Sequence, residues 1–188
     1  MSSTSSFSKL QELLPQLFQS SNIKGNLYLR CRLGVADTFL IPMEYVRESL
    51  LVEGNQITPI PQMSSCVMGL MTSREKVFCV LDLPQLVGFS ALPTYSRQHH
   101  LVVISVSPFL PHYVDDQEIF LGLGVNEIEG ITRIGVEEVF SLEEVQNLLP
   151  QDKINYWYNL SPYLEGWVKT NQKPLALLSL NSIVRASL

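Results

Sequence analysis

Short stretches in which apolar and polar residues alternate make up most of the chain beyond residue 25. Residues 27–33, Leu-Tyr-Leu-Arg-Cys-Arg-Leu, have the period of two that is typical of a strand with one buried face. Residues 38–41 return after a turn, and Pro42 ends this first predicted hairpin. Residues 44–49 predict either one helical turn or a bent edge strand.

A second hairpin is predicted over residues 67–82, where two apolar runs flank the polar tip Thr-Ser-Arg-Glu-Lys at 72–76. The segment before it, residues 57–61, contains two prolines and must be extended, because proline fixes its own φ and restricts its predecessor. After the hairpin, residues 84–88 predict a short helical turn that Gly88 ends. Asp82 precedes that turn and is expected to cap its backbone N–H groups at Gln85 or Leu86.

The second half of the chain repeats this texture. The further strands are predicted at residues 100–106, 119–125, 129–134, 166–170 and 174–180. Residues 107–117 form a polar stretch with two prolines and predict an extended hairpin loop. Ser141 and Glu144 have the spacing of a capping box, which predicts a helix through Leu149. Residues 181–185 predict a closing helix.

Many short strands with one- or two-turn helices favour small β-barrels over βαβ units. We therefore predict a mainly β fold with two hairpin-rich subdomains, at roughly 26–95 and 96–185. Residues 1–25 stand apart from this domain as a partly helical extension, in which Pro15 interrupts the helical pattern. Its apolar positions at helical spacing are Leu10, Leu13, Leu14, Leu17 and Phe18. The extension either docks on the domain or is presented to a partner.

Composition excludes several classes of function. The 188 residues are 46% hydrophobic, which is enough for a core without disulfides. The net charge of −5 and the scattered basic residues argue against nucleic-acid binding. The three cysteines have no CxxC spacing and predict reduced, partly buried thiols in a reducing compartment. Because neither a signal peptide nor a membrane-spanning run is present, we expect a cytoplasmic protein.

The candidate chemical motifs are weak. His99 and His100 would point to opposite faces of a strand and cannot both bind one metal. The Gly122-Leu-Gly124 motif lacks a third glycine and a following helix, so it is a poor dinucleotide fingerprint. Ser64-Ser65-Cys66 has no adjacent base. We expect no enzyme activity, no cofactor and no metal, although a small β-barrel enzyme or ligand-binding protein stays as an alternative.

The order of the elements resembles the CheW-like family of chemotaxis adaptors, from about Leu27 to Ile183. Four stretches carry the resemblance: RLGVADTFLIPMEYVRESL, the hairpin with the ITPIP segment before it, GLGVNEIEGITRI and LEGWVKTNQKPLALLSLNSIV. Within the hairpin, the positions that match the family pattern are Val67, Gly69, Arg74, Val77, Val80, Asp82 and Leu83.

The chain also departs from the family at the tip of this hairpin. Thr72 and Ser73 stand where the family has Asn and Leu, and Glu75 stands where it has glycine. The glycine permits a positive φ, which Glu75 would adopt at a cost of about 1–2 kcal/mol, so we expect a different turn type. Cys79 and Ser179 replace a family proline and aspartate. The differences suit a specialised copy, similar to the CheW-like proteins of type IV pilus and phototaxis clusters.

The resemblance implies two SH3-like five-stranded barrels with short helices and a non-enzymatic adaptor function. Such an adaptor couples the cytoplasmic tip of a methyl-accepting chemoreceptor to the regulatory domain of a CheA-like histidine kinase, in chemotaxis, phototaxis or pilus motility. It is recruited to membrane-associated receptor arrays without inserting into the membrane. By family match the receptor-binding positions are Val46, Glu48 and Arg74. The altered tip leaves a second alternative, a CheW-like module that has lost one of its partners.

Overall fold

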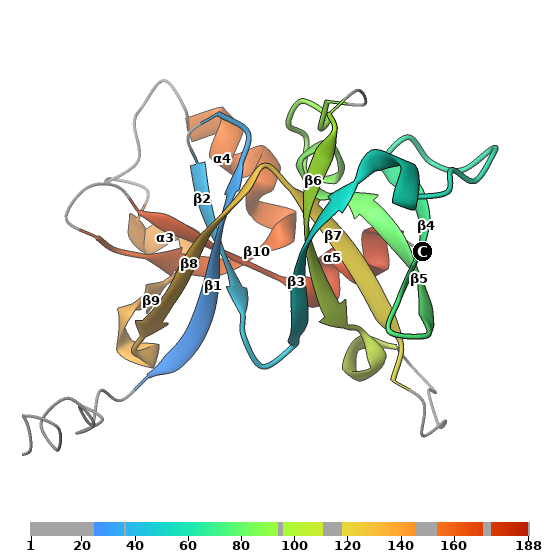
Figure 1. Ribbon diagram of the computed structural model, residues 1–188. Helices are drawn as coiled ribbons and strands as arrows, with labels where there is room; N and C mark the ends of the chain where they lie inside the picture. The colour runs from blue at the N-terminus through green and yellow to red at the C-terminus, as the bar shows by residue number, and fades with distance from the viewer. Residues whose placement is uncertain are drawn as a thin grey trace, which may run out of the picture.

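The computed structural model describes residues 25–35, 37–93, 96–110, 118–145, 154–170 and 174–187. Within these residues the chain forms two antiparallel-dominated sheets that lie side by side (Figure 1). The prediction of a mainly β fold is confirmed. The amphipathic segment predicted in residues 1–24 lies outside the described residues, as do the loop at 111–117 and the end of the helix predicted through Leu149.

The first sheet has five strands in the order β3-β6-β7-β5-β4. Their bounds are β3 Val46–Glu53, β4 Val67–Ser73, β5 Lys76–Asp82, β6 Gln98–Ser105 and β7 Phe120–Val125. The predicted hairpin at 67–82 is confirmed as β4 and β5, with Ser73 paired to Lys76 at its end. The bent-edge alternative for residues 44–49 is also confirmed, because β3 shifts register between Val46 and Glu48.

The second sheet has six strands in the order β8-β1-β2-β11-β10-β9, one strand more than the five expected for each barrel. Their bounds are β1 Asn26–Leu33, β2 Asp37–Pro42, β8 Glu127–Ile134, β9 Val139–Phe140, β10 Leu164–Val168 and β11 Leu175–Leu178. The additional strand, β9, has only two residues and pairs with the edge of β10.

Strand pairing crosses the boundary between the two predicted subdomains. β1 pairs with β8, and β2 pairs in parallel with β11, so the start of the chain joins its last third in one sheet. β3, β4 and β5 join β6 and β7 in the other sheet. Alternation of apolar residues identifies a strand but not the strand it pairs with. The sequence could therefore indicate two hairpin-rich halves without showing that their strands mix in both sheets. As subdomain bounds, 26–95 and 96–185 stay a prediction.

The helices are short and lie at the ends of strands. Their bounds are α2 Leu83–Leu86, α3 Leu142–Val145, α4 Ile154–Leu160 and α5 Leu180–Ser187, with 3₁₀ turns η1 Gly54–Gln56, η2 Ser107–Phe109, η3 Val136–Glu138 and η6 Ser161–Tyr163. The predicted capping box is present, because Ser141 N–H donates to Glu144 Oε2 at 2.7 Å and Glu144 N–H faces Ser141 Oγ at 3.4 Å. The sequence did not predict α4, whose Trp157 packs edge-on against Trp167 at 4.7 Å.

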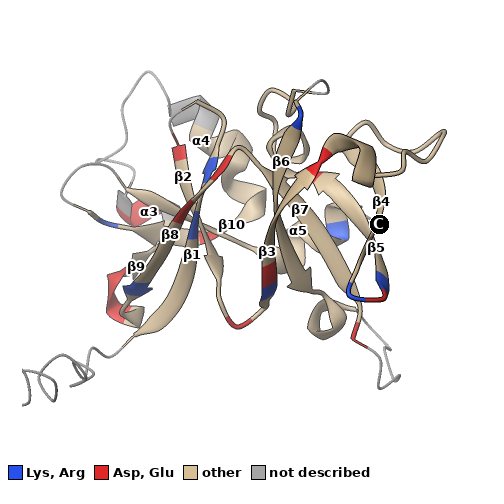
Figure 2. Cartoon of the chain, viewed as in Figure 1, with Lys and Arg blue, Asp and Glu red and all other residues tan. Residues whose placement is uncertain are grey.

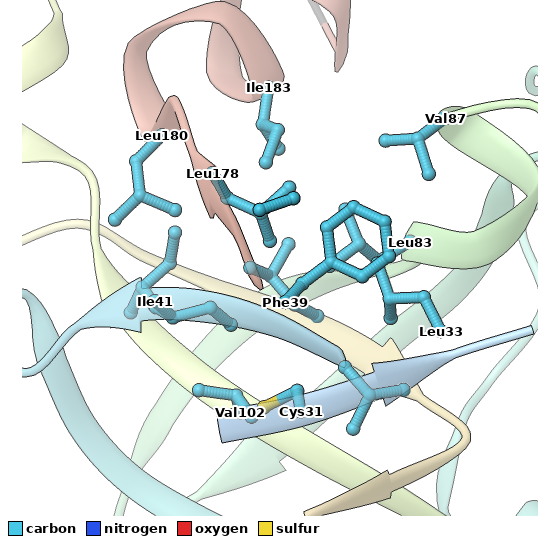
Figure 3. Close-up of a cluster of buried hydrophobic side chains, with 14 of the residues drawn as sticks. Cys31, Leu33, Phe39, Ile41, Leu83, Val87, Val102, Leu178, Leu180 and Ile183 are labelled. Carbon is cyan, nitrogen blue, oxygen red and sulfur yellow. The ribbon is translucent and has the colours of Figure 1, made fainter. Parts of the chain in front are cut away.

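Each sheet covers a small apolar cluster of its own, and a third and larger cluster joins the two. Figure 3 shows this shared core, where Cys31 and Phe39 from one sheet meet Val102 from the other. Leu180 and Ile183 of α5 cover the same cluster. Burial raises the pKa of the Cys31 thiol to about 12, so this cysteine is a packing residue. The two sheets therefore form one folded unit.

The five-stranded sheet curls until its edges approach each other. The segment after β3 reaches β4 at Thr58, where Thr58 and Leu70 exchange two backbone hydrogen bonds of 2.8 Å. Gly69 makes this approach possible, because a Cβ there would lie 2.2 Å from the Thr58 carbonyl oxygen. The family glycine of the hairpin is thus a closure residue of the barrel.

Candidate functional site

The three predicted receptor-binding positions lie on β3 and on the tip of the β4–β5 hairpin. Val46 opens β3, is half-buried and packs against the shared core. Glu48 follows after the register shift and points away from solvent, with 13% of its side chain exposed. The bend in β3 therefore turns one apolar and one acidic side chain inward, two residues apart.

The hairpin tip is a two-residue loop in an unusual backbone conformation. Arg74 and Glu75 have φ values of 47° and 66°, the positive pair that defines a type I′ turn. Such turns favour Asn-Gly, because side chains with a Cβ pay about 1–2 kcal/mol each in the left-handed region. Glu75 thus adopts the positive φ that the family glycine permits, whereas the sequence favoured a change of turn type that would avoid it. The positive φ at Arg74 was not expected either. The turn holds Arg74 outward, with 82% of its side chain exposed.

Glu48 and Arg74 meet although they come from opposite edges of the sheet order. Arg74 Nε lies 3.2 Å from Glu48 Oε2. This contact is an ion pair without hydrogen-bond geometry, because Oε2 accepts no hydrogen bond from the described residues and is sealed from solvent. Curling of the sheet thus brings two of the three predicted positions together. A buried carboxylate oxygen without a hydrogen-bond donor destabilises the folded state, and the nearby positive charge of Arg74 offsets part of this penalty.

A small cavity of about 210 Å³ adjoins this pair, at the same end of the sheet. Its rim carries alternating charges, since Arg47 Nε donates to Glu118 Oε1 at 2.7 Å and Lys76 Nζ lies 4.1 Å from the centre of the Phe120 ring. The hydrogen bond from Arg47 is the main cause that lowers the pKa of Glu118. Figure 2 shows basic and acidic positions next to one another at the tip of the β4–β5 hairpin and again on β3.

A larger groove of about 720 Å³ lies beside the β2–β3 turn, which connects the two sheets. Its strand residues come from β1, β2, β8 and β10 of the six-stranded sheet, and the β2–β3 turn, η2 and α5 complete its walls. Met43, Tyr45 and Phe109 give it an apolar side, and the rings of Tyr45 and Phe109 pack at 4.8 Å. Glu44 and Glu165 line it as well. The groove thus combines apolar anchors with polar and charged groups, an arrangement that suits an amphipathic helix.

Sequence reasoning did not single out Met43, Tyr45 or Phe109 as functional residues. The available signal was a pair of bulky apolar residues in a turn, Met43 and Tyr45 after Pro42, where polar residues are usual. Phe109 follows Pro108 in the same way. In the folded chain these three residues form one surface, which their order in the sequence could not indicate.

The weak chemical motifs have structural explanations. His99 is buried and His100 only half-buried on β6, on alternate faces as expected. Gly122 and Gly124 lie inside β7, where a Cβ would stand 3.1 Å from Phe78 and 2.8 Å from Leu92, so close packing requires them. Among the described residues, no group of three or more His, Cys, Asp or Glu side chains could hold a metal ion.

No helix in the described part of the chain has the length and hydrophobicity needed to cross a membrane.

Comparison with known proteins gives one family and one fold. The family model of the CheW-like domain matches residues 27–187. Among solved structures, the crystal structure of the scaffolding protein TtCheW from Thermoanaerobacter tengcongensis is similar, with a TM-score of 0.61 and 16% sequence identity. The match covers 83% of this chain and 90% of that one. No curated protein matches the sequence.

Proposed function

Because the chain belongs to the CheW-like domain family, we propose that it is a non-enzymatic adaptor coupling a chemoreceptor to a CheA-like histidine kinase. The observation that carries this proposal is the groove of about 720 Å³ beside the β2–β3 turn, adjacent along the chain to Val46. A helical receptor tip lays its apolar face against Met43, Tyr45 and Phe109. This gives receptor binding an apolar centre.

Glu48 and Arg74 supply the polar part of the receptor contact. Arg74 is exposed and can bridge to a carbonyl or carboxylate of the receptor through its planar guanidinium group. Glu48 contributes through its ion pair with Arg74, which positions the guanidinium group, and through the exposed 13% of its side chain. The strained turn at Arg74 and Glu75 keeps the arginine in position before binding, which reduces the entropy lost on association.

A second surface binds the regulatory domain of the kinase, barrel against barrel. The outer face of the β4–β5 hairpin suits this contact, because Leu70 pairs with Cys79 and Thr72 pairs with Val77 on one side of the sheet. Leu70 is 39% exposed and Val77 is 66% exposed. Neighbouring apolar side chains on an open strand face are typical of a protein interface. Receptor and kinase then bind on different sides of one hairpin.

The experiment that tests the receptor assignment is a pull-down with Arg74→Glu. We expect binding to the receptor tip to be lost, because the reversed charge faces Glu48 and repels it. Circular dichroism should be unchanged, since Arg74 is exposed. Arg97→Glu is the matched control, because Arg97 is also an exposed arginine but lies just before β6, at the end of the sheet away from Arg74. Retained receptor binding by Arg74→Glu, at the level of Arg97→Glu, would contradict the assignment.

The alternative of a module with only one partner rests on the altered tip, Thr72 to Glu75. Separate pull-downs with the receptor tip and with the kinase domain distinguish the two cases. The finer context that we propose is type IV pilus motility or phototaxis, with recruitment from the cytoplasm to receptor arrays. A fluorescent fusion that stays diffuse in cells with intact receptors would contradict this recruitment.

A further inference from the structure

A third cavity, of about 390 Å³, opens at the end of the five-stranded sheet opposite Arg74. β3 ends there at η1, β5 ends there at Asp82, and β6 begins there beside His99. The β4–β5 tip with Arg74 lies at the other end of the same strands (Figure 1). The walls are mostly apolar and include Ile57, Val67, Met68 and Leu92. This cavity is therefore separate from both proposed adaptor surfaces.

His99 is a buried polar group that faces this cavity. The residue is 6% exposed, and its ring makes no hydrogen bond within the described residues. The ring nitrogens of His99 are not fully sealed by the surrounding described residues. They therefore reach the open space of the cavity. Gly54 lies beside the ring, since a Cβ there would stand at an ordinary contact distance of 3.6 Å from Nε2. Burial lowers the pKa of His99, which keeps the ring neutral, with one nitrogen as an acceptor.

Asp82 is the second polar group in the cavity lining. It is 4% exposed and accepts hydrogen bonds from Gln85 N–H at 2.9 Å and from Leu92 N–H at 2.7 Å. In the part of the chain that the structure describes, no lysine or arginine pairs with it. A carboxylate has about four acceptor sites, so two remain for a ligand. The cavity thus combines a negative charge and a neutral acceptor with apolar walls.

We propose that this cavity binds a small organic amine with an apolar body. An ammonium group has three donors and no acceptor, and it complements the acceptors of Asp82 and His99. The hydrocarbon part lies against Ile57, Val67 and Leu92. A volume of about 390 Å³ suits a small molecule of this kind. This binding site goes beyond the adaptor function and does not depend on it.

Nuclear magnetic resonance titration of the full chain with benzylamine tests the proposal. Benzyl alcohol and benzoate serve as matched probes, because they keep the aromatic body and change only the charged group. We expect saturable shifts of the Leu92 amide and the His99 ring with benzylamine, with a dissociation constant on the order of 1 mM for a fragment of this size. Benzyl alcohol should bind at least about tenfold more weakly, since it lacks the charge-assisted hydrogen bond. Equal binding of the three probes, or no shift with benzylamine, overturns the proposal.

Variants localise the binding. Ala91 is exposed and lines the cavity, so Ala91→Phe should block the entrance without changing the core. We expect about a tenfold loss of benzylamine affinity for Ala91→Phe, equivalent to about 1.4 kcal/mol. Ile131→Phe on exposed β8 is the control for an added surface ring and should leave the affinity unchanged. Arg74→Glu should also leave it unchanged, which separates this site from the adaptor function. Unchanged affinity in Ala91→Phe overturns the assignment to this cavity.

Discussion

The two ends of the β4–β5 hairpin differ in what determines their conformation. At the base, Asp82 is buried and its carboxylate accepts two backbone hydrogen bonds, while Gly69 lets a neighbouring segment approach. At the tip, Arg74 and Glu75 are exposed and both have positive φ without being glycine. The residues at the base therefore suit their backbone conformation and stabilise the fold. The residues at the tip adopt a conformation that is unfavourable for them.

This difference supports the proposal that the tip is a binding site. Strained backbone persists only where the surrounding structure enforces it, and it is concentrated at functional sites. Here the paired strands on both sides enforce the turn, and the ion pair with Glu48 lies directly beneath it. Substitutions at the base should therefore change stability, and substitutions at the tip should change binding or even increase stability.

Gly69→Ala is expected to give the largest loss of stability. The added Cβ would lie 2.2 Å from a backbone oxygen, so the Thr58 segment must move away from β4. We expect a loss of about 4 kcal/mol or more in the free energy of unfolding, the range of severe core defects. Urea denaturation followed by circular dichroism measures it.

Gly130→Ala is the matched control for this change. Gly130 has a φ of 135°, close to the 146° of Gly69, but a Cβ added there would have no atom within 4 Å of it. The free energy of unfolding of Gly130→Ala should therefore fall only by the cost of a positive φ, about 1–2 kcal/mol. Equal losses for the two variants would mean that close approach at Thr58 is not the reason for the glycine.

Asp82→Ala should have the next largest effect. It removes the cap of α2 and leaves the N–H groups of Gln85 and Leu92 without acceptors. We expect a loss of about 3 kcal/mol in the free energy of unfolding. Asp82→Asn keeps one acceptor oxygen and should lose about half as much. If the two substitutions lower the free energy of unfolding equally, the acceptor oxygen that Asp82→Asn retains contributes nothing to stability.

Most individual strands could be predicted from the sequence, because alternation and turn residues are local signals. The hairpin at 67–82 and the capping role of Asp82 toward Gln85 are confirmed on that basis. Partners that follow one another along the chain were predictable as hairpins, as for β4 and β5. Long-range partners were not, since β1 also pairs with β8, far along the chain. α4 was missed because its sequence, INYWYNL, is rich in aromatic and asparagine residues with low helix propensity.

The candidate site was predictable only in part. Arg74 and Glu48 could be chosen from family resemblance, but their contact depends on the curling of the sheet, which no local pattern describes. The apolar groove around Met43 and Phe109 joins residues from two distant turns. The cavity at His99 and Asp82 was not predicted, because the two residues are far apart in the chain and each has a local structural explanation. Sites formed by tertiary contacts need the fold before they can be identified.

Glu75→Gly has the smallest expected effect and tests the tip directly. Glycine adopts the positive φ of 66° without a steric penalty, so the folded state should gain about 1 kcal/mol of stability. Glu75→Ala removes the same charge but keeps a Cβ, and we expect no comparable gain. Urea denaturation of both variants separates the backbone effect from the charge effect. If Glu75→Gly is no more stable than Glu75→Ala, the tip is not strained, and the contrast between the two ends of the hairpin loses its physical basis.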